Sequence, residues 1–165
     1  MINSENIAQM RVEDLIDALA GRHPSPGAGA AGAVTLALAA ACTAKAVAIS
    51  FVHQPDHAIL RHSGLALEAI GRFALAGADR DAETFAAFIK EHTPGAIARV
   101  IREGDRIGHL IDVLASVIER VAPHIESNMA GDLTAARALA DAARQIQAAN
   151  ATEARVQKAA LDSRF

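Results

Sequence analysis

Residues 24–52 read PSPGAGAAGAVTLALAAACTAKAVAISFV, and this stretch decides the fold. A proline- and glycine-rich turn opens a long segment of alanine, glycine, serine, threonine and aliphatic residues in which Lys45 is the only charge. A helix that faces water carries a charged side, and this segment has almost none. We therefore expect protein or lipid around it, and its small side chains would let that neighbour approach closely.

A membrane span is the first alternative, because eighteen or more nearly uncharged residues are typical of one. Lys45 argues against a span, since a lysine near its middle costs about 2.5–3.5 kcal/mol. The sequence also has no Trp or Tyr for an aromatic belt. We expect no membrane contact, and a central helix of a soluble bundle or dimer instead.

The overall composition excludes some classes of function. The 165 residues suit one domain, residues 1–165. Aromatic residues make up 3% and the net charge is −3, so no nucleic-acid surface is expected. The acidic beginning of the chain is unlike a signal or transit peptide, and the single Cys42 gives no sign of an oxidising compartment. We predict a cytoplasmic protein.

Strand signals are nearly missing and helix signals recur along the chain, which predicts an all-α helical bundle with a central small-residue helix. Six helices are expected: one ended by Gly21, the central one ended before Pro55, one from Asp56 to about Gly77, one from Asp79 or Asp81 to about Thr93, one from Ile97 to Val121, and one capped by Asp132.

Two helix starts could carry chemistry. The turn over residues 25–30 offers free backbone N–H groups and small residues, which suit an anionic or carbonyl-bearing ligand; the alternative is a turn that only begins a packed helix. In residues 127–136, SNMAGDLTAA, the Asp132 side chain is either a helix cap or a carboxylate that holds a nitrogen heterocycle or moves a proton.

Lys45 either reaches solvent or points into a pocket. The seven histidines form no metal-binding pattern, so no metal is expected.

Three motifs occur in order: PSPGAGAAGAV, DRDAETFAAFIKEHTP and NMAGDLTAA. Together, over residues 10 to about 156, they resemble the cyclodeaminase/cyclohydrolase family, known from the C-terminal half of formiminotransferase-cyclodeaminase and from stand-alone methenyltetrahydrofolate cyclohydrolases. The resemblance implies an all-helical homodimer whose substrate is a tetrahydrofolate derivative. One family reaction closes the formimino derivative to the methenyl form with loss of ammonia, and the other opens the methenyl ring with water. The absence of a formiminotransferase half favours the cyclohydrolase.

The resemblance also implies which residues form the site. Asp132 matches the family aspartate and is expected to be the catalytic residue closest to the chemistry. The glycine turn and the late motif would line the substrate together, with Phe85 at the family's middle aromatic position. The expected substrate-binding residues are Pro26, Gly27, Ala28, Gly29, Asp81, Asn128 and Gly131.

Some positions depart from the family pattern: Ala28 replaces a glycine, Ala30 a serine, Gly131 a serine and Thr134 a glycine. An added methyl group is unfavourable in a turn that needs positive φ or close approach of a ligand. The departures leave open a non-catalytic or substrate-altered relative that acts as a helical dimeric ligand-binding protein. A purely structural helical adaptor is a third class.

Overall fold

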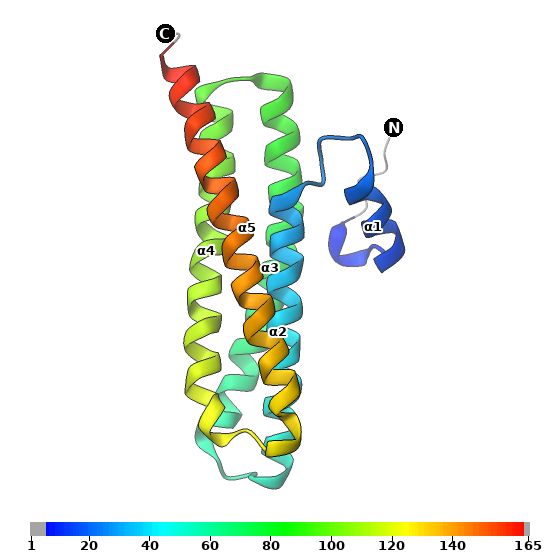
Figure 1. Cartoon of the computed structure of the whole chain (residues 1–165), viewed down its shortest axis with the longest axis vertical. Helices are drawn as coiled ribbons and strands as arrows, with labels where there is room; N and C mark the ends of the chain where they lie inside the picture. Colours follow the sequence, from blue (N-terminus) through cyan, green and yellow to red (C-terminus); the bar gives the residue numbers. More distant parts are fainter. Residues whose placement is uncertain (1–5, 164–165) are drawn as a thin grey trace.

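In a computed structural model that describes residues 6–163, the chain is a bundle of four long helices joined by short connections (Figure 1). The shorter α1 (Val12–Ala20) lies to one side of the bundle, and no strand occurs within residues 6–163. The predicted all-α fold is confirmed. The bundle helices are α2 (Ala28–His53), α3 (Ala58–Glu91), α4 (Pro94–Val121) and α5 (Ala130–Asp162), with single 3-10 turns at η1 (Ile7–Gln9), η2 (Ala122–His124) and η3 (Ser127–Met129).

Helix α2 packs between α3 and α5, and its small residues let both neighbours come close. Ala33, Leu36 and Ala39 are fully buried in the core, which α3, α4 and α5 complete with larger aliphatic side chains. The predicted central small-residue helix is therefore confirmed. By length and composition α2 is also apolar enough to cross a membrane, but only 44% of its most apolar 18-residue window is buried inside the bundle. The other side of α2 faces outward.

At Gly32, α5 packs closely against α2, so overpacking at this position tests the arrangement. A Cβ at Gly32 would lie 3.0 Å from both Ile146 Cγ2 and Gln147 Nε2. We expect Gly32→Leu to lower the free energy of unfolding by about 1–3 kcal/mol or more. Urea unfolding measures the loss. Gly108→Leu is the matched control, because a Cβ there meets nothing within 4 Å; equal stability of the two variants would contradict the packing.

Helix α3 runs without a break from Ala58 to Glu91, so the predicted boundary between Gly77 and Asp81 is wrong. Gly77 makes room for α4, because a Cβ there would lie 2.3 Å from Ile107 Cδ1. Asp79 Oδ1 accepts a hydrogen bond from the backbone N–H of Ile7 at 2.6 Å, and Asp81 faces the start of α2. The glycine and both aspartates therefore contact neighbouring elements from the middle of α3, and none of them ends or begins a helix.

The predicted helix caps at Asp56 and Asp132 are also wrong. His57 occupies the position before α3, and α5 begins at Ala130, so Asp132 lies inside its first turn. The Asp132 carboxylate instead accepts a hydrogen bond from Lys45 Nζ at 3.0 Å. Lys45 therefore lies on the surface of the bundle, with its charge paired to the next helix.

Candidate functional site

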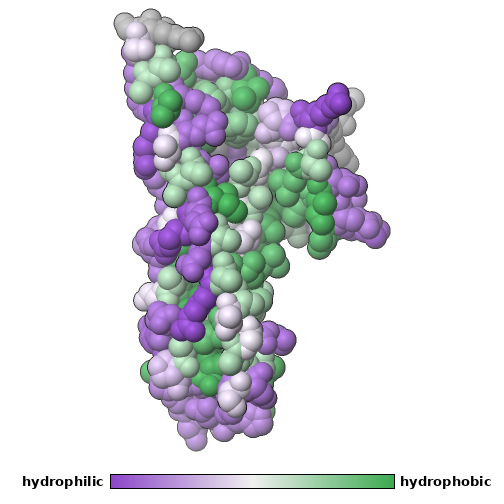
Figure 2. Space-filling view, viewed as in Figure 1, coloured by the Kyte–Doolittle hydropathy of each residue, from purple (hydrophilic) through white to green (hydrophobic). Residues whose placement is uncertain are grey.

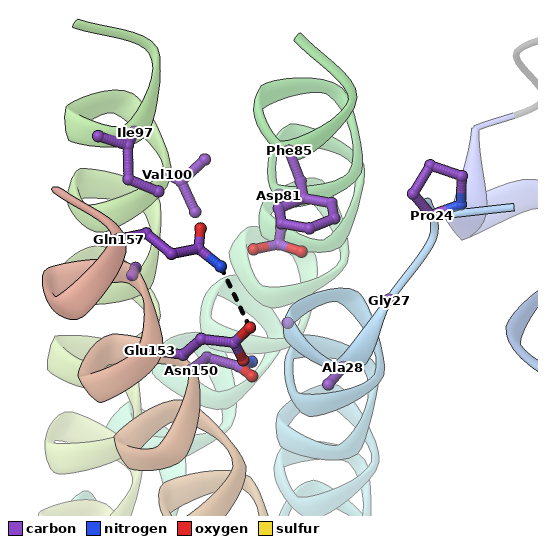
Figure 3. Close-up of a pocket in the computed structure, with 12 residues that line it drawn as sticks. Pro24, Gly27, Ala28, Asp81, Phe85, Ile97, Val100, Asn150, Glu153 and Gln157 are labelled. Atoms are coloured by element: carbon purple, nitrogen blue, oxygen red, sulfur yellow. Dashed lines mark hydrogen bonds between the residues drawn. The ribbon is translucent and has the colours of Figure 1, made fainter. Parts of the chain in front are cut away.

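A cavity of about 240 Å³ lies at the end of the bundle where α2 begins (Figure 3). All four long helices contribute to it, so its shape depends on the packing of the whole bundle. Its walls are apolar on the α4 side, where Ile97 and Val100 lie, and polar where α3 and α5 approach α2. The lining residues are Pro24, Gly27, Ala28, Gly29, Asp81, Phe85, Ile97, Val100, Asn150, Glu153, Ala154 and Gln157.

The glycine turn places the first backbone of α2 against this cavity. The first helical hydrogen bond runs from the Ala31 N–H to the Gly27 carbonyl, so the N–H groups of residues 28–30 have no partner within their own helix. Gly27 has a φ of −124°, and no described glycine has a positive φ. The turn therefore does not need a glycine for its backbone angles. Ala28, which replaces a family glycine, is accommodated as an exposed first residue of α2.

Asp81 of α3 sits directly over this helix start. A Cβ at Gly29 would lie 2.3 and 2.4 Å from the two Asp81 carboxylate oxygens, so the carboxylate occupies the space that a side chain at Gly29 would take. The pKa of Asp81 is raised from 3.8 to about 6. Burial is the main cause of this rise, a hydrogen bond from the Ala30 backbone opposes it, and the nearby charge of Glu103 adds to it. A carboxyl group with a pKa near 6 can both accept and donate a proton near neutral pH.

Two buried polar side chains, Glu103 and Gln147, make hydrogen bonds around Asp81 and the first turn of α2. The buried Glu103 of α4 accepts a hydrogen bond from Arg80 Nε at 2.9 Å and also pairs with Arg106. On the other side of the turn, the buried Gln147 of α5 donates from Nε2 to the Gly29 carbonyl at 3.3 Å. The first turn of α2 is thus held between α3 and α5, with Asp81 against its Gly29 backbone.

A second carboxylate, Glu153, comes from α5 and accepts a hydrogen bond from Gln157 Nε2 at 3.2 Å (Figure 3). The residues that line the cavity include these two carboxylates and no Lys or Arg. The α5 lining residues were missed from the sequence because they sit inside a long helix, away from any turn or glycine. Their only signal is a three- or four-residue spacing along one helix face.

Some of the predicted site residues meet in this cavity and others do not. Gly27, Ala28, Gly29 and Asp81 line it together with Phe85, whereas Pro26 lies in the same turn but does not line it. Asn128, Gly131 and Asp132 lie at the other end of the bundle, where α5 begins. Asp132 is level with Lys45, which lies about 25 Å along α2 from the glycine turn. Within one chain, the glycine turn and the late aspartate motif therefore do not share a site.

A model of the formiminotransferase-cyclodeaminase family matches residues 11–95, just over half of the chain. The chain belongs to this family. The matched part includes the glycine turn and Asp81, the two features that meet in the cavity. No curated protein sequence matches the chain.

The fold is also that of a known cyclodeaminase. The crystal structure of formiminotetrahydrofolate cyclodeaminase from Thermotoga maritima superposes with a TM-score of 0.83 at 21% sequence identity. The alignment covers 90% of this chain and 79% of that one. At this identity the likeness shows a shared fold, and the family assignment follows from the sequence match. Within residues 6–163 no group of three or more His, Cys, Asp or Glu residues could hold a metal ion, and metal-independence stays a prediction.

Proposed function

We propose that this chain is a folate-dependent one-carbon enzyme, a methenyltetrahydrofolate cyclohydrolase or a formiminotetrahydrofolate cyclodeaminase, and that it works in the cavity at the start of α2. The observation that carries the proposal is Asp81, a carboxyl group with a pKa of about 6 that lines a cavity beside a glycine turn. Family membership supports a folate substrate, and the cavity supports proton transfer.

In the cyclohydrolase reaction, water adds to the methenyl carbon between N5 and N10. The Asp81 carboxylate accepts the proton that the attacking water loses, which gives a tetrahedral carbon bonded to a hydroxyl group and both nitrogens. The protonated Asp81 then donates to one nitrogen as its bond to carbon breaks. This donation returns Asp81 to its carboxylate form. The hydroxyl group loses its remaining proton to solvent as the formyl C=O forms, which leaves a formyl group on one nitrogen and a free amine at the other.

The charge of the cavity suits this substrate. The methenyl bridge is a cationic amidinium, and the protonated formimino group is cationic as well. Asp81 and Glu153 place negative charge in a cavity whose lining includes no cation, so the cationic one-carbon unit would be favoured there over an anion. The cavity of about 240 Å³ is smaller than a usual site for a drug-sized ligand. It would enclose the one-carbon end of a folate and leave the anionic glutamate tail outside.

The cyclodeaminase reaction places the same demands on Asp81. The second nitrogen attacks the formimino carbon, a tetrahedral carbon again forms between nitrogens, and the departing ammonia needs a proton. The alternative of a non-catalytic ligand-binding relative predicts folate binding without turnover.

We also propose that residues 1–165 act as one domain and that the protein works in the cytoplasm as a homodimer. Asp132, Asn128 and Gly131 would then contribute to the site from a second copy.

The loss of methenyltetrahydrofolate absorbance, measured with purified protein against buffer, tests the cyclohydrolase. Release of ammonia from formiminotetrahydrofolate tests the cyclodeaminase. Acceleration of either reaction, abolished in Asp81→Asn, would support the proposal. Tight folate binding with neither reaction would contradict it in favour of a ligand-binding relative.

A further inference from the structure

A second cavity, of about 250 Å³, lies between α3 and α4 at the end of the bundle where α3 begins and α4 ends (Figure 1). Ser63 of this cavity and Asp81 of the first cavity belong to the same unbroken helix, and they lie about 27 Å apart along its axis. The two cavities are therefore separate. The second one is lined by Ala58, Ile59, His62, Ser63, Ala66 and Arg120.

Ser63 brings a buried hydroxyl group with no hydrogen-bond partner to this cavity. The residue is only 5% exposed, and its Oγ atom makes no hydrogen bond within residues 6–163. A hydroxyl group inside a helix can donate to the carbonyl four residues earlier, as Thr35, Thr43 and Thr84 do here at 2.8–2.9 Å. A buried polar group without a partner is unfavourable, so the Ser63 hydroxyl is available to a group that enters the cavity.

Arg120 of α4 places a positive charge at the cavity, and none of the described residues that line it is an Asp or Glu. The neighbouring acid, Glu119, is occupied by Arg137 of α5, whose Nε and Nη2 donate to it at 3.0 and 2.9 Å. Arg120 itself makes no ion pair or hydrogen bond within the described part of the chain. A guanidinium group presents its N–H donors in a planar fork that matches the two oxygens of a carboxylate. Arg120 is therefore free to bind an anion.

His62 and the start of α3 add further donors. His62 lines the cavity, and an imidazole carries an N–H donor in either neutral tautomer. The first helical hydrogen bond of α3 runs from the Arg61 N–H to the His57 carbonyl, so the N–H groups of residues 58–60 have no partner within their own helix. The positive end of a helix favours a negative charge close to it. The side chains and the helix end thus favour the same kind of ligand, an anion.

The rest of the lining selects the kind of anion. Ala58, Ile59 and Ala66 form apolar walls, and Arg120 supplies a single positive charge. A phosphate dianion would bring more charge into this largely apolar cavity than the lining neutralises, which is unfavourable, whereas a carboxylate brings one charge. On the face that Figure 2 shows, this end of the bundle is largely hydrophilic, which suits a water-soluble ligand better than a lipid.

We propose that the second cavity binds a small carboxylate with a short apolar body. Its oxygens accept hydrogen bonds from Arg120, His62 and Ser63, and its carbon atoms pack on Ile59. The cavity at the start of α2, with two carboxylates and no cation among its described lining residues, has the opposite charge. The carboxylate site does not depend on the proposed folate chemistry.

Butyrate, a short-chain carboxylate, serves as the probe in an amide NMR titration of the whole chain at constant ionic strength. We expect saturable shifts confined to residues 58–66 and 117–122, with a Kd of about 1 mM, which is reasonable for so small a ligand. Butyramide has the same shape without the charge and should bind about tenfold more weakly or worse, and inorganic phosphate should also bind more weakly than butyrate.

Three results of this titration would overturn the proposal. The first is the absence of saturable shifts up to about 50 mM butyrate, far above the expected Kd. The second is equal binding of butyrate and butyramide, which would show that the charge plays no part. The third is tighter binding of inorganic phosphate than of butyrate, which would contradict the choice of a carboxylate.

Arg120→Gln should weaken butyrate binding by about tenfold or more, because it removes charge-assisted hydrogen bonds to the ligand. Arg102→Gln is the matched control. Arg102 is also exposed, makes no ion pair within residues 6–163, and lies on the same face of α4 about five turns earlier. The control should leave the Kd unchanged. Equal weakening by the two substitutions would show an effect of net charge alone and would contradict the site.

Ser63→Ala separates a binding role of the hydroxyl group from a structural one. Butyrate binding should weaken by about tenfold, whereas urea unfolding without butyrate should show a variant at least as stable as the wild type, because no hydrogen bond is lost. Ser116→Ala, on an exposed position of α4, should change neither quantity. Lower stability of Ser63→Ala with an unchanged butyrate Kd would show a structural hydroxyl group and would contradict its place in the site.

Discussion

Asp81→Asn is expected to lower the rate of methenyltetrahydrofolate opening by about 10²- to 10⁴-fold, the range for loss of a general acid–base group. The same change should make the protein more stable at pH 7–8. The two effects have one cause, because the buried site that raises the pKa of Asp81 to about 6 also makes its ionised form unfavourable. Asparagine keeps the shape and a hydrogen-bond acceptor for Ala30, but it neither ionises nor transfers a proton.

The pH dependence of that stability gain follows from the raised pKa. A carboxyl group whose pKa is higher in the folded protein contributes stability that is fully present below its unfolded pKa of 3.8 and lost as the pH rises through about 6. Asp81→Asn should therefore gain about 1–3 kcal/mol relative to wild type at pH 7–8. The gain should shrink through pH 6–4 and vanish below that range.

Urea unfolding of wild type and Asp81→Asn at several pH values measures this difference. Asp141→Asn serves as a control, because Asp141 is exposed on the outer side of α5 and should give no pH-dependent gain. A variant that is less stable than wild type at pH 8 would show that Asp81 is a structural helix cap.

Gly29→Ala should remove activity almost as completely as loss of Asp81, although it adds only one methyl group. The new Cβ would fall within 2.4 Å of both Asp81 carboxylate oxygens, so the carboxylate must leave its position over the start of α2. We expect at least a 100-fold loss of rate, since misplacement of a reacting group by about 1 Å is enough for that. Overpacking should also lower the free energy of unfolding by about 1–3 kcal/mol.

Gly27→Ala is the matched control for this substitution, two residues earlier in the same turn. Its Cβ would meet only the Pro24 carbonyl oxygen, at an ordinary 3.6 Å, and its φ of −124° suits alanine. This variant should keep its rate and its stability within a small factor of wild type. Equal activity of Gly29→Ala and Gly27→Ala would show that the position of Asp81 does not matter for turnover.

The sequence predicted most of the helices correctly, but not the contacts that some of their residues make with distant parts of the chain. The periodicity of apolar residues, the turn before α2 and the proline after α4 predict the bundle, because helix formation and burial of an apolar face are local properties. The predicted helix boundary between Gly77 and Asp81 was wrong. A glycine followed by aspartates usually marks the end of one helix and the start of the next, but here it lies inside α3. The roles of the glycine and the aspartates depend on Ile107, on the N–H of Ile7 and on α2, which are distant in the sequence.

Some residues of the candidate site could be predicted from the sequence and others could not. The glycine turn could be identified because backbone N–H groups at a helix start are a local feature, and Asp81 followed from the family resemblance. Glu153 and Asn150 could not be identified, because they look like any polar residue on a long helix. The distance between Asp132 and the glycine turn is a property of helix length and direction, which the motifs do not encode.

The pH profile of methenyltetrahydrofolate opening by the wild-type protein, corrected for the buffer rate, tests most directly whether Asp81 performs the chemistry. With Asp81 as general base, kcat/KM should rise about tenfold per pH unit below pH 6 and level off above it, and Asp81→Asn should lose this dependence together with the rate. A wild-type profile that is flat through pH 6, or an Asp81→Asn variant that keeps both the rate and the profile, would contradict the account.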